Sequence, residues 1–137
     1  MTRTSSTTSD QNQHLVRSLY EEYINPGRLD QMSSLISPTF VSQTFTGVAG
    51  EKGPEEFCLS VAKLRAAIPD LHFTIEDIFA ESDRVSVRWQ LTGTAQSSAS
   101  TGRPVRQPGI VIYHVQHGLI ERAWRHTDLA SLLQQIG

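Results

Sequence analysis

The sequence predicts an α+β fold in which N-terminal helices cover one face of a curved, mostly antiparallel sheet. Apolar residues recur at spacings of three and four between residues 14 and 68, which is typical of amphipathic helices. From residue 71 onward they alternate with polar residues, which is typical of half-buried strands. Helices followed by consecutive strands indicate layers packed around one core. A sheet that curves around helices leaves a cone with an open end, and such concave spaces bind ligands.

Three helices are expected before the main run of strands, and a fourth over the last ten residues. The first begins at His14 and ends at "NPGRLD" (25–30), because Asn-Pro-Gly cannot continue a helix. The second is short and ends before Pro38. The third covers 53–68, where Pro54 suits a first helical turn.

Five strands are expected, because β-branched and aromatic residues concentrate in five segments. The first is "TFVSQTFTG" (39–47). The other four follow the third helix and cover 71–82, 83–96, 109–118 and 119–128. Turns are predicted at Ser82-Asp83, in the Gly/Pro-rich segment 102–109, and at His117-Gly118.

The length of 137 residues predicts a single domain over 12–137, preceded by a frayed or disordered tail over 1–11. A net charge of -2 gives no basic surface for nucleic acid, and no apolar run is long enough to span a membrane. The N-terminus lacks the apolar stretch of a signal peptide. The single cysteine, Cys58, is interpreted as a buried apolar residue and fits a reducing compartment. We therefore expect a cytoplasmic protein without nucleic-acid or membrane partners.

Alternation along the last strand places five residues on one side: Ile120, Arg122, Trp124, His126 and Asp128. Trp124 and Ile120 favour this side as the interior, so Asp128 is expected to point inward. Ile112 and His114 share a face of the preceding strand. Hairpin pairing puts residues 113 or 114 opposite 121 to 122 and Asp128 opposite about 107 to 108. A contact between His114 and Asp128 therefore needs strong twist, a bulge, or a bridging water or substrate.

Asp128 has two interpretations that the sequence leaves open. Apolar surroundings would raise the pKa of its carboxyl, and a carboxylate so tuned can remove a proton from an activated carbon and return it later. Such a proton shuttle needs no cofactor. The alternative is that Asp128 caps the closing helix, because "TDLASLL" has the pattern of a capped N-terminus. The two roles can coexist.

The chain resembles the SnoaL-like polyketide cyclase family of the NTF2-like superfamily over residues 12–137. The resemblance rests on Pro69-Asp70 before the strands, on Asp83-Arg84-Val85, on the pattern Gly118-x-Ile120-x-x-x-Trp124, and on Asp128. It implies a cone-shaped barrel that forms a dimer or tetramer through the outer face of the sheet. It also implies ring closure of a small hydrophobic substrate by intramolecular aldol condensation, without metal or cofactor.

The resemblance implies site residues as well. Asp128 matches the family's catalytic acid/base, and His114 matches a position that carries histidine in some cyclases. We expect His114, with Gln43, to stabilise the developing oxyanion. The alternatives are that His114 is a polar residue bonded to a neighbouring strand and that Gln43 is an exposed amide on its strand. Further substrate contacts are expected from Trp89, Trp124, Ile112, Arg122 and His126, and the two tryptophans could equally be core residues. No metal is assigned, because the histidines lack metal-ligand spacing.

Three functions follow from these observations. The first is a polyketide-type cyclase, or a related isomerase or lyase, that uses Asp128 as its acid/base. The second is a non-catalytic protein that binds a small molecule in the same space, favoured by the apolar Ala95 where many relatives carry histidine. The third is an epoxide hydrolase, which needs two aspartates and an arginine, and no second inward aspartate is evident.

Overall fold

The computed structural model describes residues 3–96 and 102–136. The helical segments, in chain order, are α1 (Arg3–Ser18), the π-helical η1 (Leu19–Ile24), α2 (Leu29–Met32), the 3-10 helical η2 (Ser33–Leu35), α3 (Gly53–Ala67) and α4 (Leu129–Ile136). The helix η1 continues α1 directly, and its π-helical pitch sets Tyr20 deep in the core. Within the described ranges, no helix is long and apolar enough to cross a membrane.

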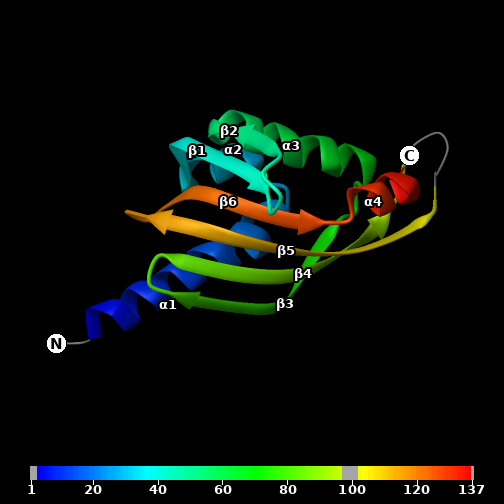
Figure 1. Cartoon of the computed structure of the whole chain (residues 1–137). Coiled ribbons are helices and arrows are strands. Elements are labelled where there is room, and N and C mark those ends of the chain that lie inside the picture. Colours follow the sequence, from blue (N-terminus) through cyan, green and yellow to red (C-terminus); the bar gives the residue numbers. More distant parts are fainter. Residues whose placement is uncertain (1–2, 97–101, 137) are drawn as a thin grey trace.

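One six-stranded sheet makes up the rest of the chain. Its strands are β1 (Ile36–Thr44), β2 (Ala49–Lys52), β3 (His72–Glu81), β4 (Arg84–Thr94), β5 (Pro104–Gln116) and β6 (Leu119–Thr127). They lie in the order β2-β1-β6-β5-β4-β3. Only β1 and β6 pair in parallel, and the other neighbours are antiparallel (Figure 1). The predicted α+β class with a mostly antiparallel sheet is confirmed.

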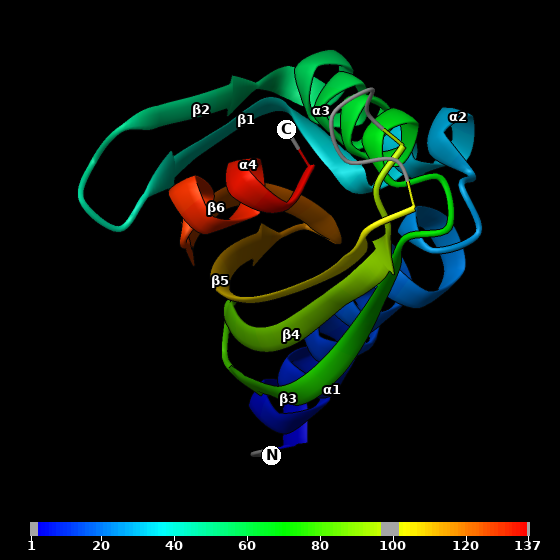
Figure 2. The same cartoon turned by 90° about the vertical axis from the view of Figure 1, so that its right-hand side faces the viewer.

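The sheet curves strongly but does not close, with β2 and β3 at its two edges (Figure 2). On the concave side α1 packs against β3 and β4, and α3 packs against β1 and β2. Side chains from both layers form one apolar core, which includes Val16, Leu19, Phe40, Phe57, Ile68, Val87, Val111 and Ile120. Figure 2 also shows α4 at the open end of the curve, in front of β6. The concave face is therefore bounded by α1, α3 and α4.

Two boundaries in the N-terminal half differ from the expected ones. The first helix begins at Arg3 rather than His14. Two residues in or next to the segment expected as a tail hydrogen bond to the turn at Ser82. The backbone N–H of Ser82 donates to the hydroxyl of Ser9 at 2.8 Å, and its backbone oxygen accepts from the side-chain amide of Asn12 at 2.9 Å. β1 begins at Ile36, so the residue expected to end the second helix starts a strand instead. The short strand β2 was not predicted, because it is mostly exposed and lacks apolar alternation.

The segment 102–109, predicted as a turn, is mostly strand, and this prediction is wrong. β5 begins at Pro104 and pairs with β4 through Pro108 opposite Gln90. β6 ends at Thr127, opposite Gly109, so the first residues of β5 have a strand neighbour on one side only. Proline lacks a backbone N–H and is tolerated at such an edge. The prolines therefore mark the edge of a strand rather than a loop.

A β-bulge in β6 decides which of its side chains face the core. Val115 lies opposite Ile120, whereas His114 lies opposite Arg122, so β6 holds one extra residue over this stretch. An extra residue moves every later side chain to the opposite face. Ala123 is therefore buried, whereas Trp124 belongs to the convex face. The predicted common face of residues 120 to 128 is wrong beyond the bulge.

Candidate functional site

Asp128 lies just after β6 and caps α4. Its Oδ1 accepts a hydrogen bond from the backbone N–H of Ser131 at 3.1 Å, and its backbone oxygen accepts one from Leu132. The side chain is exposed. The prediction that Asp128 points into a dry interior is wrong for this conformation, and the alternative prediction of a helix cap is confirmed. The preceding residue, Thr127, makes the inward contact instead, through hydrogen bonds with Gln107 and Pro108.

Three predicted substrate contacts of β6 lie on the convex face of the sheet. The guanidinium groups of Arg84 and Arg122 lie over the ring of Trp124, at 5.0 and 5.4 Å from its centre. His126 is exposed and stacks on Phe45, with ring centres 5.7 Å apart. The bulge is the reason for this placement, because it reverses the alternation on which the prediction depended.

Gln43, Ile112 and His114 also lie on the convex face. Gln43 lies beside Trp124 in the parallel pairing of β1 with β6, and Ile112 lies opposite Trp124 in β5. The imidazole Nε2 of His114 contacts Oδ2 of Asp83 at 2.9 Å. The structure therefore brings neither His114 nor Gln43 toward Asp128. Their catalytic and binding roles stay predictions. Of the predicted substrate contacts, Trp89 alone faces the core.

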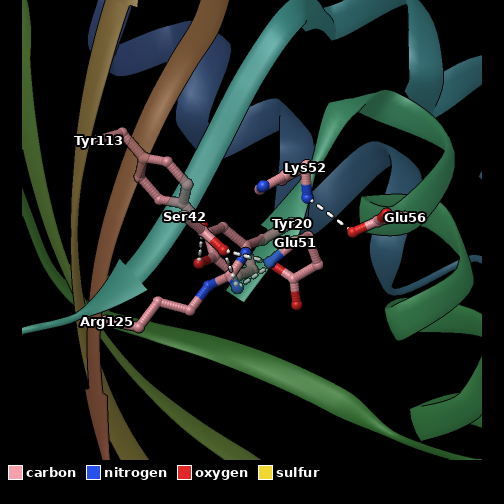
Figure 3. A network of polar contacts seen from close by, with 7 residues as sticks. All are labelled: Tyr20, Ser42, Glu51, Lys52, Glu56, Tyr113 and Arg125. Carbon is pink, nitrogen blue, oxygen red and sulfur yellow. Dashed lines mark hydrogen bonds and ion pairs between the residues drawn. The ribbon is translucent and has the colours of Figure 1, made fainter. Parts of the chain in front are cut away.

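The concave face carries a polar cluster centred on Arg125, Glu51 and Ser42, drawn in Figure 3. Arg125 comes from β6, and its Nη1 forms a close ion pair with Oε1 of Glu51, from β2. The same nitrogen donates to the hydroxyl of Ser42, from β1, at 3.3 Å, and that hydroxyl donates to Glu51 at 2.7 Å. The Arg125 guanidinium also lies over the ring of Phe57, 5.4 Å from its centre. Three strands and α3 thus hold one charged pair inside the curve of the sheet.

Two tyrosine hydroxyls meet next to this pair. The hydroxyl of Tyr20, on η1, and that of Tyr113, on β5, lie 2.5 Å apart and are both buried. Tyr20 also packs on Phe73, with ring centres 5.4 Å apart. A buried tyrosine needs a partner for its hydroxyl, and each of these provides one for the other. The helical layer and the sheet are joined by a polar contact at this point of the core.

Trp89, on β4, completes the cluster from the side of β3. Its ring packs edge-on against Phe73, with ring centres 4.8 Å apart. A Cβ atom at Gly109, the residue opposite it in β5, would lie 2.4 Å from the indole ring, so only glycine leaves room for this tryptophan. Among the described residues, the indole N–H of Trp89 is the only buried side-chain polar atom without a hydrogen-bond partner.

The electrostatics of the cluster favour an ionised Arg125–Glu51 pair. Burial alone would raise the pKa of Glu51, but Arg125 and the hydroxyl of Ser42 stabilise the carboxylate and hold the pKa below its ordinary value. Burial alone would lower the pKa of Arg125, but Tyr113 and Glu51 favour its charged form and the pKa is raised. The concave face therefore carries an ionised pair without net charge beside the tyrosines.

The tyrosines are neutral hydrogen-bond donors. Burial raises the pKa of Tyr113, and it raises the pKa of Tyr20 well above its ordinary value. The positive charge of Arg125 acts in the opposite direction on both hydroxyls but does not outweigh burial. Both groups consequently keep their protons at neutral pH, and one of the two protons is donated in the hydrogen bond between them.

Side-chain hydrogen bonds attach α4 at the open end of the concave face. The side-chain amide of Gln135 donates to Oε1 of the buried Gln107 at 3.0 Å, and its oxygen accepts from the backbone N–H of Arg106 at 2.8 Å. Gln107 in turn donates to Thr127 at 3.2 Å. One glutamine of α4 thus fastens the helix to the end of β5, close to where β6 ends at Asp128.

Sequence reasoning missed Arg125, Glu51 and Ser42 as site residues, and assigned Tyr20 only to an apolar helical face. Tyr113 alone carried a usable signal, since a tyrosine between the buried Val111 and Val115 must satisfy its hydroxyl inside the core. Arg125 carried none, because its inward orientation depends on the bulge.

The fold and the polar interior define a small α+β domain built around the concave face of one sheet. Within that class, the family model described as SnoaL-like polyketide cyclase matches residues 14–136. The match covers most of the 137 residues, so the chain belongs to the SnoaL-like polyketide cyclase family, and the predicted resemblance is confirmed. No curated protein matches the chain.

Solved structures agree with this assignment. A candidate SnoaL-like polyketide cyclase from Jannaschia sp. CCS1 is 24% identical with a TM-score of 0.80, over 94% of this chain and 93% of that one. IdmH, a candidate polyketide cyclase from Streptomyces antibioticus, is 26% identical with a TM-score of 0.77, over 91% and 97%. A candidate ketosteroid isomerase from Kribbella flavida is 17% identical with a TM-score of 0.69, over 88% and 79%. The first and third comparisons show the fold alone.

Proposed function

We propose that the chain is a cofactor-independent acid/base enzyme of the cyclase or isomerase type that acts on a small hydrophobic carbonyl compound. Family membership and the similarity to IdmH support this proposal. The observation that carries it is the concave face, where neutral tyrosines and an ionised arginine–glutamate pair lie together in an apolar core. Such preorganised groups stabilise the negative charge that develops on oxygen when a carbonyl compound loses a proton from carbon.

Asp128 is the proposed proton acceptor. Glu51 is a poor base, because Arg125 holds it ionised and occupied and keeps its pKa low. Asp128 has no ion pair with any described residue and directly precedes α4, the helix at the open end of the concave face. Its carboxylate would take a proton from the carbon next to a carbonyl. In a cyclase the resulting enolate carbon bonds to a second carbonyl carbon of the same molecule, and the new alkoxide recovers the proton from Asp128.

Asp128→Asn tests this role, because asparagine caps a helix as well as aspartate does but cannot accept the proton. We expect the variant to fold normally and to lose about 100-fold or more of the rate of deuterium exchange next to the carbonyl of 2-tetralone, a small apolar ketone, followed by NMR. Asp10→Asn, a change at an exposed carboxylate on α1, is the matched control. Equal exchange by both variants and the wild type would remove Asp128 from the mechanism.

A non-catalytic binding protein is the second candidate function. The cap that Asp128 provides for α4 favours it, because that carboxylate already has a structural role. This alternative expects saturable binding of an apolar carbonyl compound without any exchange above the uncatalysed rate. The exchange experiment therefore separates the two functions.

We also propose that the chain forms a homo-oligomer through the convex face of its sheet. Phe79 and Ile110 expose 66% and 39% of their surface there. On the same face Ile112 pairs with Trp124 on β6 and with Ser86 on β4, and Ser86 pairs with Phe79 on β3. Exposed apolar side chains gathered on one side of a sheet are typical of a surface that a second subunit covers.

A further inference from the structure

A groove lies between α2 and α3 on the outer surface of the molecule, where Figure 2 shows the two helices beside each other. Its volume is about 420 Å³. The apolar part of its lining comes from Leu29 of α2 and from Cys58, Leu59 and Ala62 of α3. The groove shares no lining residue with the polar cluster of the concave face, so it is a separate surface.

The helix α3 carries apolar residues on two faces. Phe57, Val61 and Leu64 follow the spacing of one helical face and pack in or against the core. Leu59 and Ala62 lie three residues apart on another face, and Leu59 exposes 55% of its surface. Packing against the sheet explains the first face only. The second face is available to another molecule, because the groove between the helices leaves it uncovered.

Carboxylates rim this groove. Asp30 of α2 and Glu55 of α3 line it and have no ion pair within 3–96 and 102–136. Glu56 lines it too and accepts a hydrogen bond from the backbone N–H of Lys52 at 2.8 Å. Arg28 lies at the adjoining end, so three carboxylates accompany one guanidinium. An apolar partner would remove these charges from water without compensation, whereas a partner with cations would pair with them.

The walls of the groove favour a helical partner. The long wall is α3, whose backbone N–H and C=O groups bond within the helix and offer an extended peptide no partners. A helix satisfies its own backbone and can present apolar side chains at the spacing of Leu59 and Ala62. Because Leu59 is largely exposed, the groove suits a helix laid along the surface better than an enclosed small molecule.

We propose that the groove between α2 and α3 binds an amphipathic helix of a partner protein. Leucine-like residues of that helix pack on Leu29, Leu59 and Ala62, and its lysine or arginine residues lie against Asp30 and Glu55. The proposal does not depend on the proposed enzyme activity. It also uses a different surface from the convex face of the sheet.

The test uses a fluorescein-labelled helical peptide of sequence LKKLLKLLKKLLKL and its counterpart LEELLELLEELLEL, in which glutamate replaces lysine. Fluorescence anisotropy measures the binding of each peptide to the full-length protein. We expect the basic peptide to bind about tenfold or more tightly than the acidic one, because only its charges complement the rim of the groove. Its affinity should fall as the salt concentration rises, since the carboxylates lie at the surface.

Two variants change the groove, and two matched variants change equally exposed residues elsewhere. Leu59→Ala should weaken binding of the basic peptide about tenfold, because it removes an apolar contact. Glu55→Gln should weaken it about threefold, as expected for one exposed ion pair. The controls are Val48→Ala, between β1 and β2, and Glu76→Gln, on β3, and both should bind as the wild type does. All four residues are exposed, so each variant should fold.

The single cysteine reports where the peptide binds. Cys58 lines the groove and is partly exposed, so the bound basic peptide should slow its reaction with N-ethylmaleimide. Equal binding of the two peptides, equal losses in the groove and control variants, or unchanged reactivity of Cys58 would overturn the proposal. Protection of Cys58 that grows with protein concentration, without peptide, would assign the groove to a second copy of the chain and would also overturn it.

Discussion

The residues that distinguish this interior from an ordinary apolar core are Arg125 and Glu51. Removing two charges from water costs as much as their attraction returns, so a buried pair adds little net stability compared with well-packed apolar residues. The Arg125 and Glu51 side chains are 30% and 17% exposed, which reduces but does not remove this cost. The pair has two explanations, a role in the site beside the tyrosines or the joining of β2 to β6 in the fold.

Two substitutions separate these explanations. Glu51→Gln leaves Arg125 without its counter-charge and should lower the free energy of unfolding by about 2 kcal/mol at neutral pH, measured with urea. The double change Glu51→Leu with Arg125→Met should cost less than about 1 kcal/mol or stabilise the chain. A double variant that is strongly destabilised would show that the pair serves the fold instead.

The dependence of folding stability on pH provides a further test of the Arg125–Glu51 pair. Because Arg125 holds the pKa of Glu51 below its ordinary value, the carboxylate contributes stability above the unfolded-state pKa, near 4.5. That contribution is lost as the pH falls through the lower pKa of the folded state. Glu51→Gln should therefore flatten the decline in stability below about pH 4.5 relative to the wild type.

At the scale of elements, β6 explains why the sequence predicted the fold better than the site. Alternation correctly placed Val85, Val87 and Trp89 on one face of β4, which has no irregularity in its pairing with β5. In β6 the bulge reverses the pattern, and nothing in "LIERAWRHTD" marks the extra residue. Bulges depend on the pairing of two strands, so one strand read alone cannot reveal them. For that reason the sequence did not predict that Arg125 points toward the concave face.

The attachment of α4 can be tested at Gln135, which hydrogen bonds to β5, whereas Leu132 packs against the core. Gln135→Ala removes its hydrogen bonds to Gln107 and to the backbone of Arg106, each worth about 1 kcal/mol. We expect faster amide hydrogen exchange in α4, with little change in global stability. Gln134→Ala, at the exposed neighbouring residue, should change neither quantity. Equal exchange in the two variants would mean that Gln135 does not hold α4 in place.

At the scale of the whole molecule, the spacing of apolar residues along the sequence was sufficient to predict the fold class. Apolar spacing changes from the helical to the strand period near residue 71, and the structure changes from helices to a continuous run of strands at His72. The same alternation leaves apolar residues on the convex face, where no element within 3–96 or 102–136 covers them. Exposed alternate positions that are apolar indicate that the other side of the sheet is also a contact surface.

The convex face therefore predicts the behaviour of the chain in solution. We expect the wild type to sediment as a dimer or tetramer, and Ile110→Lys to shift it toward the monomer, because the new charge adds to Arg88 opposite it and must be desolvated in the interface. The fold should tolerate the change, since Ile110 is exposed in the single chain. Leu59→Lys, at an exposed apolar residue of α3, is the control that should leave assembly unchanged. A monomeric wild type, or dissociation by the α3 variant alone, would reject assembly through the sheet.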